Sequence, residues 1–320
     1  MIFLSPFVLF TEVLALPPMA ARLNIQLDND NNLNVPVFIG THSDSQQTAY
    51  LDTSSRYLRL LPDEVSHGGL SIGPFTLLGS NEQANLYVGS QDNINPSRTR
   101  TIGANFVSDF AREVGALMLV PSDTSESVAM IVGNFEPQEF CADPIVTVPA
   151  LFAAPAQGIG MVYLSVSFVD RFGNEITNPT QPEHFQFDAS FHVDWVPSGV
   201  MDNFQHIIEE DFGYELYADF TTEIHAPCAQ IIDRLPSIRY SILDTSRENY
   251  ILDVILPPRD YIRIDASGNC DVQLLEVNEQ DAEYDSRLQA TPNILGTNFL
   301  RQVAILFDYR NRQFGFCEPL

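Results

Sequence analysis

The chain has 320 residues, of which 45% are hydrophobic and 11% aromatic. This is enough apolar material for one large or two modest domains, and it excludes an intrinsically disordered chain. The chain carries 42 acidic against 16 basic residues, for a formal net charge of -26, and every basic residue is arginine. A surface this negative repels phosphate backbones and anionic lipids, so we expect neither a nucleic-acid partner nor binding to acidic membranes.

Residues 1–21 have the apolar core and the small-residue exit of a secretory signal peptide. No basic residue precedes that core and Glu12 interrupts it, so a membrane anchor and a buried strand stay open as alternatives. We expect cleavage near Ala20 or Ala21. No later stretch reaches the roughly 18 apolar residues that cross a bilayer, so no membrane span is predicted.

Most of the following chain is typical of short β-strands, because β-branched and aromatic runs alternate with breaks rich in Gly, Pro, Asn and Asp. Helical periodicity is confined to 104–116 and 198–213. Strands and helices do not alternate, so a parallel α/β fold is excluded and an all-β fold with short helices is predicted. The expected strands are 35–40, 48–54, 56–62, 116–121, 127–133, 161–169, 240–244, 250–257 and 261–266.

A proline-rich segment at 144–156 is the expected boundary between two lobes, 22–150 and 151–320. Each half contains a hydrophobic strand that ends in an aspartate, Asp52 in the first and Asp188 in the second. Each half also contains a hydrophobic-hydrophobic-glycine triplet, expected at 77–79 and 294–296. One acid per repeat suggests two related lobes that face each other across a cleft, with both carboxylates in it.

These segments resemble the pepsin-like aspartic peptidases. The stretch 293–316, with Ile-Leu-Gly, a short helix, a strand, an Asp-x-x-Asn turn and a Gly-Phe strand, is similar to the closing segment of that family. The stretches 187–204 and 36–62 are similar to its two aspartate loops. The resemblance covers the chain from about residue 22 and implies a bilobal fold of two related β-barrel-like lobes around a cleft.

The resemblance further implies that Asp52 and Asp188 are the catalytic pair. Two close carboxylates cannot both ionise, so they share a proton. The ionised one then deprotonates a bound water that attacks a peptide carbonyl, while the protonated one polarises the carbonyl oxygen. Such a site needs no cofactor. The ligand implied in the cleft is a protein or peptide, and we expect a monomer.

Four departures from the family pattern weaken that chemistry. The glycine that follows the family's Asp-Thr or Asp-Ser is replaced in both loops, Asp52-Thr53-Ser54 and Asp188-Ala189-Ser190. Ala189 lacks the hydroxyl that links the lobes, and Phe191 replaces a small hydroxyl residue. Only residues 53–76 separate Asp52 from the first triplet, which leaves little room for a flap over the cleft. The segment 84–100, with Tyr87, is an alternative flap.

We therefore expect a pepsin-like homologue in which proteolysis is lost or weak and which acts as a binding or structural module. The alternative is a divergent but active endopeptidase that uses Asp52, Asp188 and a bound water. Retention of both aspartates favours the alternative, whereas the altered loops favour the first hypothesis.

The four cysteines have no CxxC spacing and no clustered histidines beside them, so no metal site is predicted. Their even number suggests disulfides and an oxidising compartment, and we expect a secreted, extracellular or acidic endomembrane protein. The resemblance implies a bridge between Cys228 and Cys270. Because the crossover and the chain ends share a sheet in this fold, we also predict a Cys141–Cys317 bridge.

Overall fold

A computed structural model describes seventeen segments of the chain, and all structural statements below refer to them. They are residues 21–27, 33–39, 46–52, 58–60, 70–77, 83–89, 94–96, 101–103, 116–122, 127–133, 135–152, 160–189, 191–218, 221–244, 249–277, 293–308 and 311–320. The predicted helix at 104–116 lies almost wholly outside these segments, and so does the predicted signal peptide except for Ala21. Ala21 begins the first strand and is fully buried.

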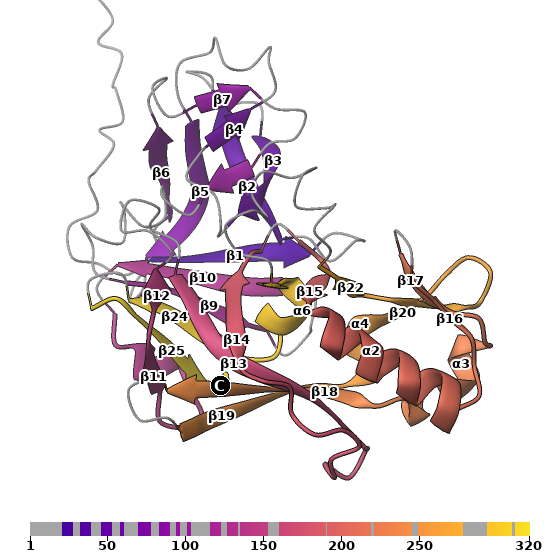
Figure 1. The fold of residues 1–320 in the computed structure, drawn as a ribbon. Helices are drawn as coiled ribbons and strands as arrows, with labels where there is room; N and C mark the ends of the chain where they lie inside the picture. Colours follow the sequence, from indigo (N-terminus) through magenta and orange to yellow (C-terminus); the bar gives the residue numbers. More distant parts are fainter. Residues whose placement is uncertain are drawn as a thin grey trace, which may run out of the picture.

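The largest of the three sheets has 13 strands, in which neighbours follow the order β11-β25-β24-β9-β10-β1-β5-β2-β3-β8-β4-β7, with β6 paired to β5. In Figure 1 its strands β2 to β7 lie at the top, above β1, β9, β10, β24 and β25 of the same sheet. The strands are β1 (Ala21–Leu27), β2 (Leu33–Ile39), β3 (Gln46–Asp52), β4 (Leu58–Leu60), β5 (Leu70–Leu77), β6 (Gln83–Gly89), β7 (Ile94–Pro96), β8 (Thr101–Gly103), β9 (Ala116–Pro121), β10 (Ser127–Gly133), β11 (Val146–Pro149), β24 (Ala304–Asp308) and β25 (Gln313–Cys317).

The second half of the chain builds an 8-stranded sheet, β19-β18-β13-β14-β23-β15-β22 with β12 paired to β13, and a 4-stranded sheet, β16-β17-β21-β20. The strands are β12 (Leu151–Phe152), β13 (Gly160–Val169), β14 (Glu183–Phe187), β15 (Asp194–Val196), β16 (Leu216–Ala218), β17 (Thr222–Ile224), β18 (Ser237–Asp244), β19 (Asn249–Leu256), β20 (Ile262–Ile264), β21 (Cys270–Val272), β22 (Leu274–Glu276) and β23 (Asn293–Leu295).

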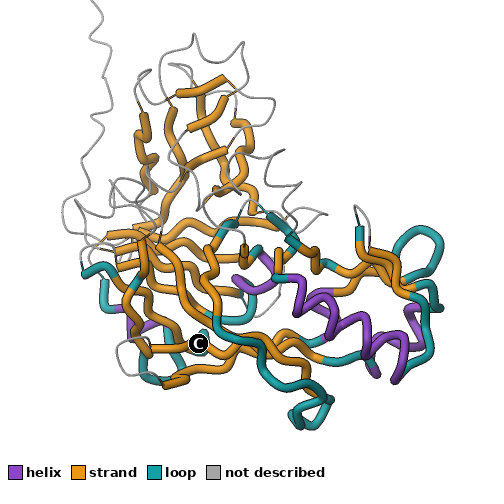
Figure 2. Tube along the Cα trace, viewed as in Figure 1, coloured by secondary structure: helices purple, strands orange, loops and turns teal. Residues whose placement is uncertain are grey.

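Helices are short and few among the described residues, as Figure 2 shows. They are η3 (Pro137–Phe140), α2 (Ser198–His206), η4 (Ile207–Asp211), α3 (Cys228–Ile231), η5 (Ile232–Arg234), α4 (Pro258–Tyr261) and α6 (Thr297–Leu300). The predicted helix at 198–213 is observed as α2 followed by the π-helical turn η4. Its buried side chains are the predicted ones, Val200, Met201, Phe204, Ile207 and Ile208. No helix of the described residues is long and apolar enough to cross a membrane.

The mostly-β prediction is confirmed, and the predicted strands correspond to β2, β3, β4, β9, β10, β13, β18, β19 and β20. The described strands form open sheets rather than closed barrels. β11 pairs with β25 in the first sheet and β12 pairs with β13 in the second, so the chain passes between sheets around Ala150. The lobe boundaries 22–150 and 151–320 stay a prediction, although the passage falls within the proline-rich segment.

An aromatic cluster joins the two sheets. The Phe187 ring, at the end of β14, lies 5.1 Å from the Phe314 ring and 6.0 Å from the Phe316 ring, both on β25. Phe299 of α6 lies 5.7 Å from the same ring. Such offset and edge-on contacts are the favoured aromatic geometries and bury large apolar areas. Because Phe187 directly precedes Asp188, this cluster fixes the position of the second aspartate loop.

The two halves repeat one strand arrangement. The order β2-β3-β8-β4-β7 in the first half corresponds to β13-β14-β23-β15-β22 in the second. In both, the four successive pairings are antiparallel, parallel, antiparallel and parallel. The faint internal repeat of the sequence is therefore present as a repeat of topology.

Candidate functional site

The repeated arrangement relates the two predicted aspartates position by position. Asp52 ends β3 opposite Gly103 of β8. In the second half Phe187 pairs with Leu295, so Asp188 and Gly296 follow at the corresponding positions. Further along, Arg59 faces Thr101 and Trp195 faces Ile294, which keeps the same register in both halves.

This register corrects one sequence prediction. The first-half counterpart of 294–296 is Thr101-Ile102-Gly103 rather than Leu77-Leu78-Gly79, because β8 is the strand that runs parallel beside β3. β5, which ends at Leu77, pairs with β1, β2 and β6 instead. The interval between Asp52 and its paired strand therefore runs over 53–100. It contains the β5–β6 hairpin, so the expectation that little room is left for a hairpin was wrong.

Asp188 lies in a closely held backbone. Its side chain is buried, with 1% of the residue exposed. Its N–H donates to the Leu295 carbonyl oxygen at 3.0 Å, and its own carbonyl accepts from the Phe191 N–H at 3.2 Å. The Phe191 carbonyl in turn accepts from the Thr297 N–H at 2.8 Å. These bonds hold the second aspartate loop against the start of α6.

The first aspartate loop is described only through its strand. Asp52 is the last residue of β3, and its side chain and residues 53–57 lie outside the described residues. The separation of the Asp52 and Asp188 carboxylates therefore stays a prediction. The register of β3 with β8 supports it.

Two replaced positions of the second loop are observed directly. Ala189 is fully buried, so its methyl group occupies an interior position in which the family pattern has a hydroxyl. The Phe191 ring meets the indole of Trp195 edge-on at 6.2 Å. Phe191 therefore makes an apolar contact three residues after Asp188, at a position where the family pattern has a small hydroxyl residue. Ser190 lies outside the described residues.

Sequence reasoning missed a third carboxyl group, that of Asp194. It lies on β15 and is fully buried. The Tyr240 hydroxyl donates to its Oδ2 at 2.7 Å, and the Gly296 N–H donates to its Oδ1 at 2.7 Å. Gly296 is the second-half counterpart of Gly103, which pairs with Asp52. By binding Gly296, Asp194 therefore fixes the backbone next to Asp188. The equivalent first-half residue is Leu58, which faces Ile94 as Asp194 faces Leu274.

Burial raises the pKa of Asp194 from 3.8 to about 6, because the ionised form loses its hydration. The hydrogen bonds from Tyr240 and Gly296 favour the ionised form and offset part of this shift. The same burial and the neighbouring carboxylate raise the pKa of Tyr240 well above its ordinary value, so the phenol stays protonated and acts as a donor. Tyr261 is the other titratable group that faces this pair.

We expect the stability of the protein to fall between pH 4 and pH 6 because of Asp194. In that interval the folded chain holds a proton that the unfolded chain has lost, so the free energy of unfolding decreases as the pH rises. The full effect is about 3 kcal/mol, reached above the folded pKa. Urea unfolding at pH 4 and pH 7 measures it.

The matched variant is Asp194→Asn, which keeps an acceptor for Gly296 but does not titrate. The variant should lack the contribution of Asp194 to the free energy of unfolding. The difference between wild type and variant should therefore change by about 2.4 kcal/mol between the two pH values, because the unfolded carboxyl is already partly ionised at pH 4. The other acidic groups act equally in both proteins. The same pH dependence in both would contradict the prediction.

Two further polar side chains follow Gly296. Thr297 and Asn298 are fully buried in α6. The Thr297 hydroxyl and both amide atoms of Asn298 have no hydrogen-bond partner among the described residues. A buried polar group without a partner lowers the stability of the folded chain by about 1–3 kcal/mol, so such groups are rare in proteins. No local pattern in the sequence distinguishes them from exposed helix residues.

No protein-family model matches the chain, and no curated protein matches it in sequence. Its fold is similar to those of many solved structures, of which two are examples. An aspartic proteinase from Irpex lacteus matches with a TM-score of 0.58 and 14% identity, over 93% of this chain and 98% of that protein. The basic 7S globulin from soybean matches with a TM-score of 0.61 and 13% identity, over 94% of this chain and 97% of that protein. The match extends over nearly the whole length of all three proteins.

Proposed function

We propose that this chain, which has the pepsin-like bilobal fold, is a peptide- or protein-binding module whose proteolytic activity is lost or weak. The observation that carries the proposal is the second aspartate loop, in which buried Ala189 follows Asp188 and contributes no hydroxyl. A reciprocal hydrogen-bond network that fixes two carboxylates loses one of its members there. Catalysis by positioned groups falls steeply when positioning is lost.

The second candidate is a divergent endopeptidase. The register that puts Asp52 and Asp188 at equivalent strand ends favours it. In this mechanism one ionised carboxylate accepts a proton from water as the water oxygen attacks the peptide carbonyl carbon. The other, protonated, carboxyl donates its proton to the carbonyl oxygen, which gives a neutral tetrahedral diol. The structural resemblance to the Irpex lacteus aspartic proteinase fits this alternative in fold alone.

Two disulfides fit an oxidising environment. The net charge of -26 causes self-repulsion, which decreases when carboxylates become protonated, so the composition also fits an acidic environment. We include a secreted or acidic endomembrane location in the proposal on these two grounds. A monomeric state is part of it as well.

We expect no hydrolysis of a reduced, carboxymethylated protein substrate between pH 2.5 and pH 6, together with measurable binding of pepstatin by calorimetry. Asp188→Asn should weaken that binding, because its carboxyl group lies at the centre of the proposed cleft. Asp202→Asn, at an exposed position of α2, is the control and should behave as wild type.

Pepstatin-sensitive cleavage that falls at least about 100-fold in both Asp52→Asn and Asp188→Asn would overturn the binding-module proposal and establish the endopeptidase. Absence of both cleavage and pepstatin binding would reject a functional cleft of either kind.

A further inference from the structure

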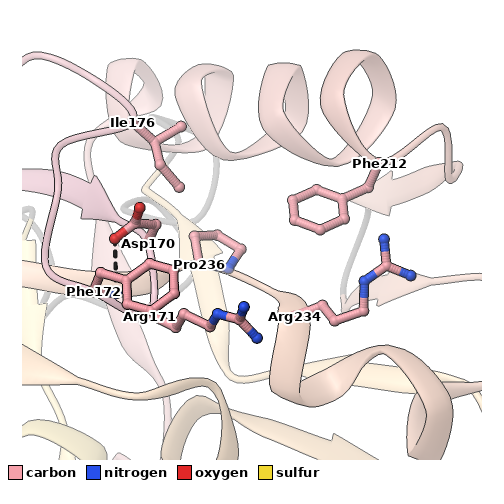
Figure 3. A pocket seen from close by; sticks show the side chains of 7 residues that line it. All are labelled: Asp170, Arg171, Phe172, Ile176, Phe212, Arg234 and Pro236. Carbon is pink, nitrogen blue, oxygen red and sulfur yellow. Dashed lines mark hydrogen bonds between the residues drawn. The ribbon is translucent and has the colours of Figure 1, made fainter.

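A surface pocket of about 350 Å³ lies on the second half of the molecule. The turn that follows β13 forms one wall, and the residues after η4 and around η5 form the other (Figure 3). The side chains that matter here are Arg171, Phe172, Ile176, Phe212, Arg234 and Pro236. Asp188 lies at the opposite end of β13 from this turn, about 30 Å away along a 10-residue strand.

The turn that forms the first wall is rigidly built. The Asp170 carboxylate accepts from the Phe172 N–H at 2.8 Å and from the Asn174 N–H and side-chain amide at 2.9 Å each. Gly173 supplies the left-handed φ of 84° that the turn requires. Arg239 of β18 donates to the Gly173 carbonyl oxygen at 2.7 Å and pairs with Glu175 at 3.1 Å. A surface held in this way loses little conformational entropy when it binds a partner.

The pocket has a large exposed apolar rim. Phe172 is 74% exposed and Ile176 38%. The Arg171 guanidinium lies 4.7 Å from the centroid of the Phe172 ring, close enough for a cation–π contact. Aromatic and arginine side chains together are the composition found at the centres of protein interfaces. Because Phe172 is so exposed, a protein segment that extends across the rim would remove a large apolar surface from water.

The charge of the pocket is opposite to that of the chain. Neither Arg171 nor Arg234 forms a salt bridge within the described segments, although the charge of Arg171 acts on the adjacent Asp170 carboxylate. Neighbouring Arg259, in contrast, binds Asp233 in a bidentate pair at 2.7 and 2.8 Å. The Asp170 carboxylate is bound to its own turn, where the Asn174 hydrogen bonds lower its pKa, and Figure 3 shows it on the side away from Arg234. Two available guanidiniums beside apolar rings can bind a carboxylate that carries an apolar neighbour.

The geometry points to a docking surface for a protein partner, which inserts a carboxylate side chain flanked by an aromatic residue between Arg171 and Arg234. The exposed rim argues for a protein segment, and the two arginines argue for an acidic one. At physiological ionic strength the Debye length is about 8 Å, so the remote acids of this chain do not prevent such docking. The surface is independent of the cleft and of the function proposed for it.

Fluorescence polarisation of labelled peptides tests this on the full chain. The probe is the amidated peptide Gly-Glu-Phe-Glu-Gly-NH2 with the fluorophore on its N-terminal amine, and the comparison peptides replace both Glu by Gln or Phe by Gly. We expect the first to bind, and both comparison peptides to bind at least about fivefold more weakly. Binding of the probe should be weaker by the same factor or more in each of three variants, Arg171→Gln, Arg234→Gln and Phe172→Ala. All three positions are exposed, so the variants should fold.

Arg22→Gln is the charge-matched control, because Arg22 is exposed on β1 and far along the chain from the pocket; it should change binding by less than about twofold. Probe binding that is the same in all variants, or no binding at millimolar peptide, would overturn the proposal. Equal binding of 3-phenylpropionate would overturn the protein partner and assign the pocket to a small carboxylate. If the contact depends on charge, the affinity for the probe should also fall as the salt concentration rises from 50 to 500 mM. This fall should be smaller in the two arginine variants than in wild type.

Discussion

Replacing Gly296 by alanine is expected to lower the free energy of unfolding by about 4 kcal/mol or more, or to prevent folding. A Cβ at this position would overlap the Val193 carbonyl oxygen and come within 2.7 Å of the Phe191 carbonyl oxygen. Both of these oxygens belong to the backbone, so the clash cannot be relieved by a change of side-chain rotamer. The backbone around Gly296 also binds Asp194, so any displacement would weaken that hydrogen bond. Urea unfolding followed by circular dichroism measures the loss.

Gly199 provides the matched control. It lies in α2, and a Cβ there would meet no atom within 4 Å. Gly199→Ala should therefore stabilise the protein by about 0.5–1 kcal/mol, since alanine favours the helix and restricts the unfolded chain. If the two variants have similar stabilities, close packing at Gly296 is not what holds the second aspartate loop.

Removing the Cys141–Cys317 bridge is expected to cost about 5 kcal/mol. The structure contains both predicted disulfides, with a sequence separation of 176 for this one and 42 for Cys228–Cys270. In the chain-entropy model the longer loop constrains the unfolded chain more, and the corresponding values are about 5 and about 4 kcal/mol. The double variant Cys141→Ala with Cys317→Ala should also unfold with a larger urea m-value, because its unfolded state is less compact.

The comparison variant is Cys228→Ala with Cys270→Ala, measured in the same way. Native contacts around the first bridge remain after its removal. The Ala142 N–H donates to the Glu318 carbonyl at 2.9 Å, and the Glu318 N–H donates to the Asp143 carboxylate at 2.7 Å. A loss below about 2 kcal/mol with an unchanged m-value would mean that these contacts, and not the bridge, secure the chain end.

The segments around Asp188, 294–296 and α2 were predictable because each of them has a local signal in the sequence. The sequence around Asp188 and the triplet at 294–296 lie in strands that pair directly, and α2 has a clear apolar periodicity. The first half was harder. Leu77-Leu78-Gly79 matches a hydrophobic-hydrophobic-glycine pattern, whereas the observed Thr101-Ile102-Gly103 begins with a polar residue. Which segment pairs in parallel with β3 depends on contacts distant in sequence, and no local pattern reports them.

Asp194 was missed for a related reason. In the sequence, Asp194 stands shortly before Pro197-Ser198-Gly199, and an aspartate beside such residues is typical of a surface turn. Its burial results from Tyr240 on β18 and from Gly296 at the end of β23, both far away in the sequence. The same holds for Asn298, because a four-residue helix has no periodicity from which its buried side could be deduced. Polar residues inside a fold are the ones that local patterns predict least well.

The position of the last two strands has a consequence for synthesis on the ribosome. β24 lies between β9 and β25, and β25 lies between β24 and β11, so the sheet of the first half is completed by strands that are translated after all strands of the second-half sheets. Until they emerge, β9 and β11 present unpaired strand edges, which can pair with other chains. Cys141 must likewise wait for Cys317. Folding of the first-half sheet is therefore coupled to folding of the second half, because its last two strands reach it only after the second-half strands have been made.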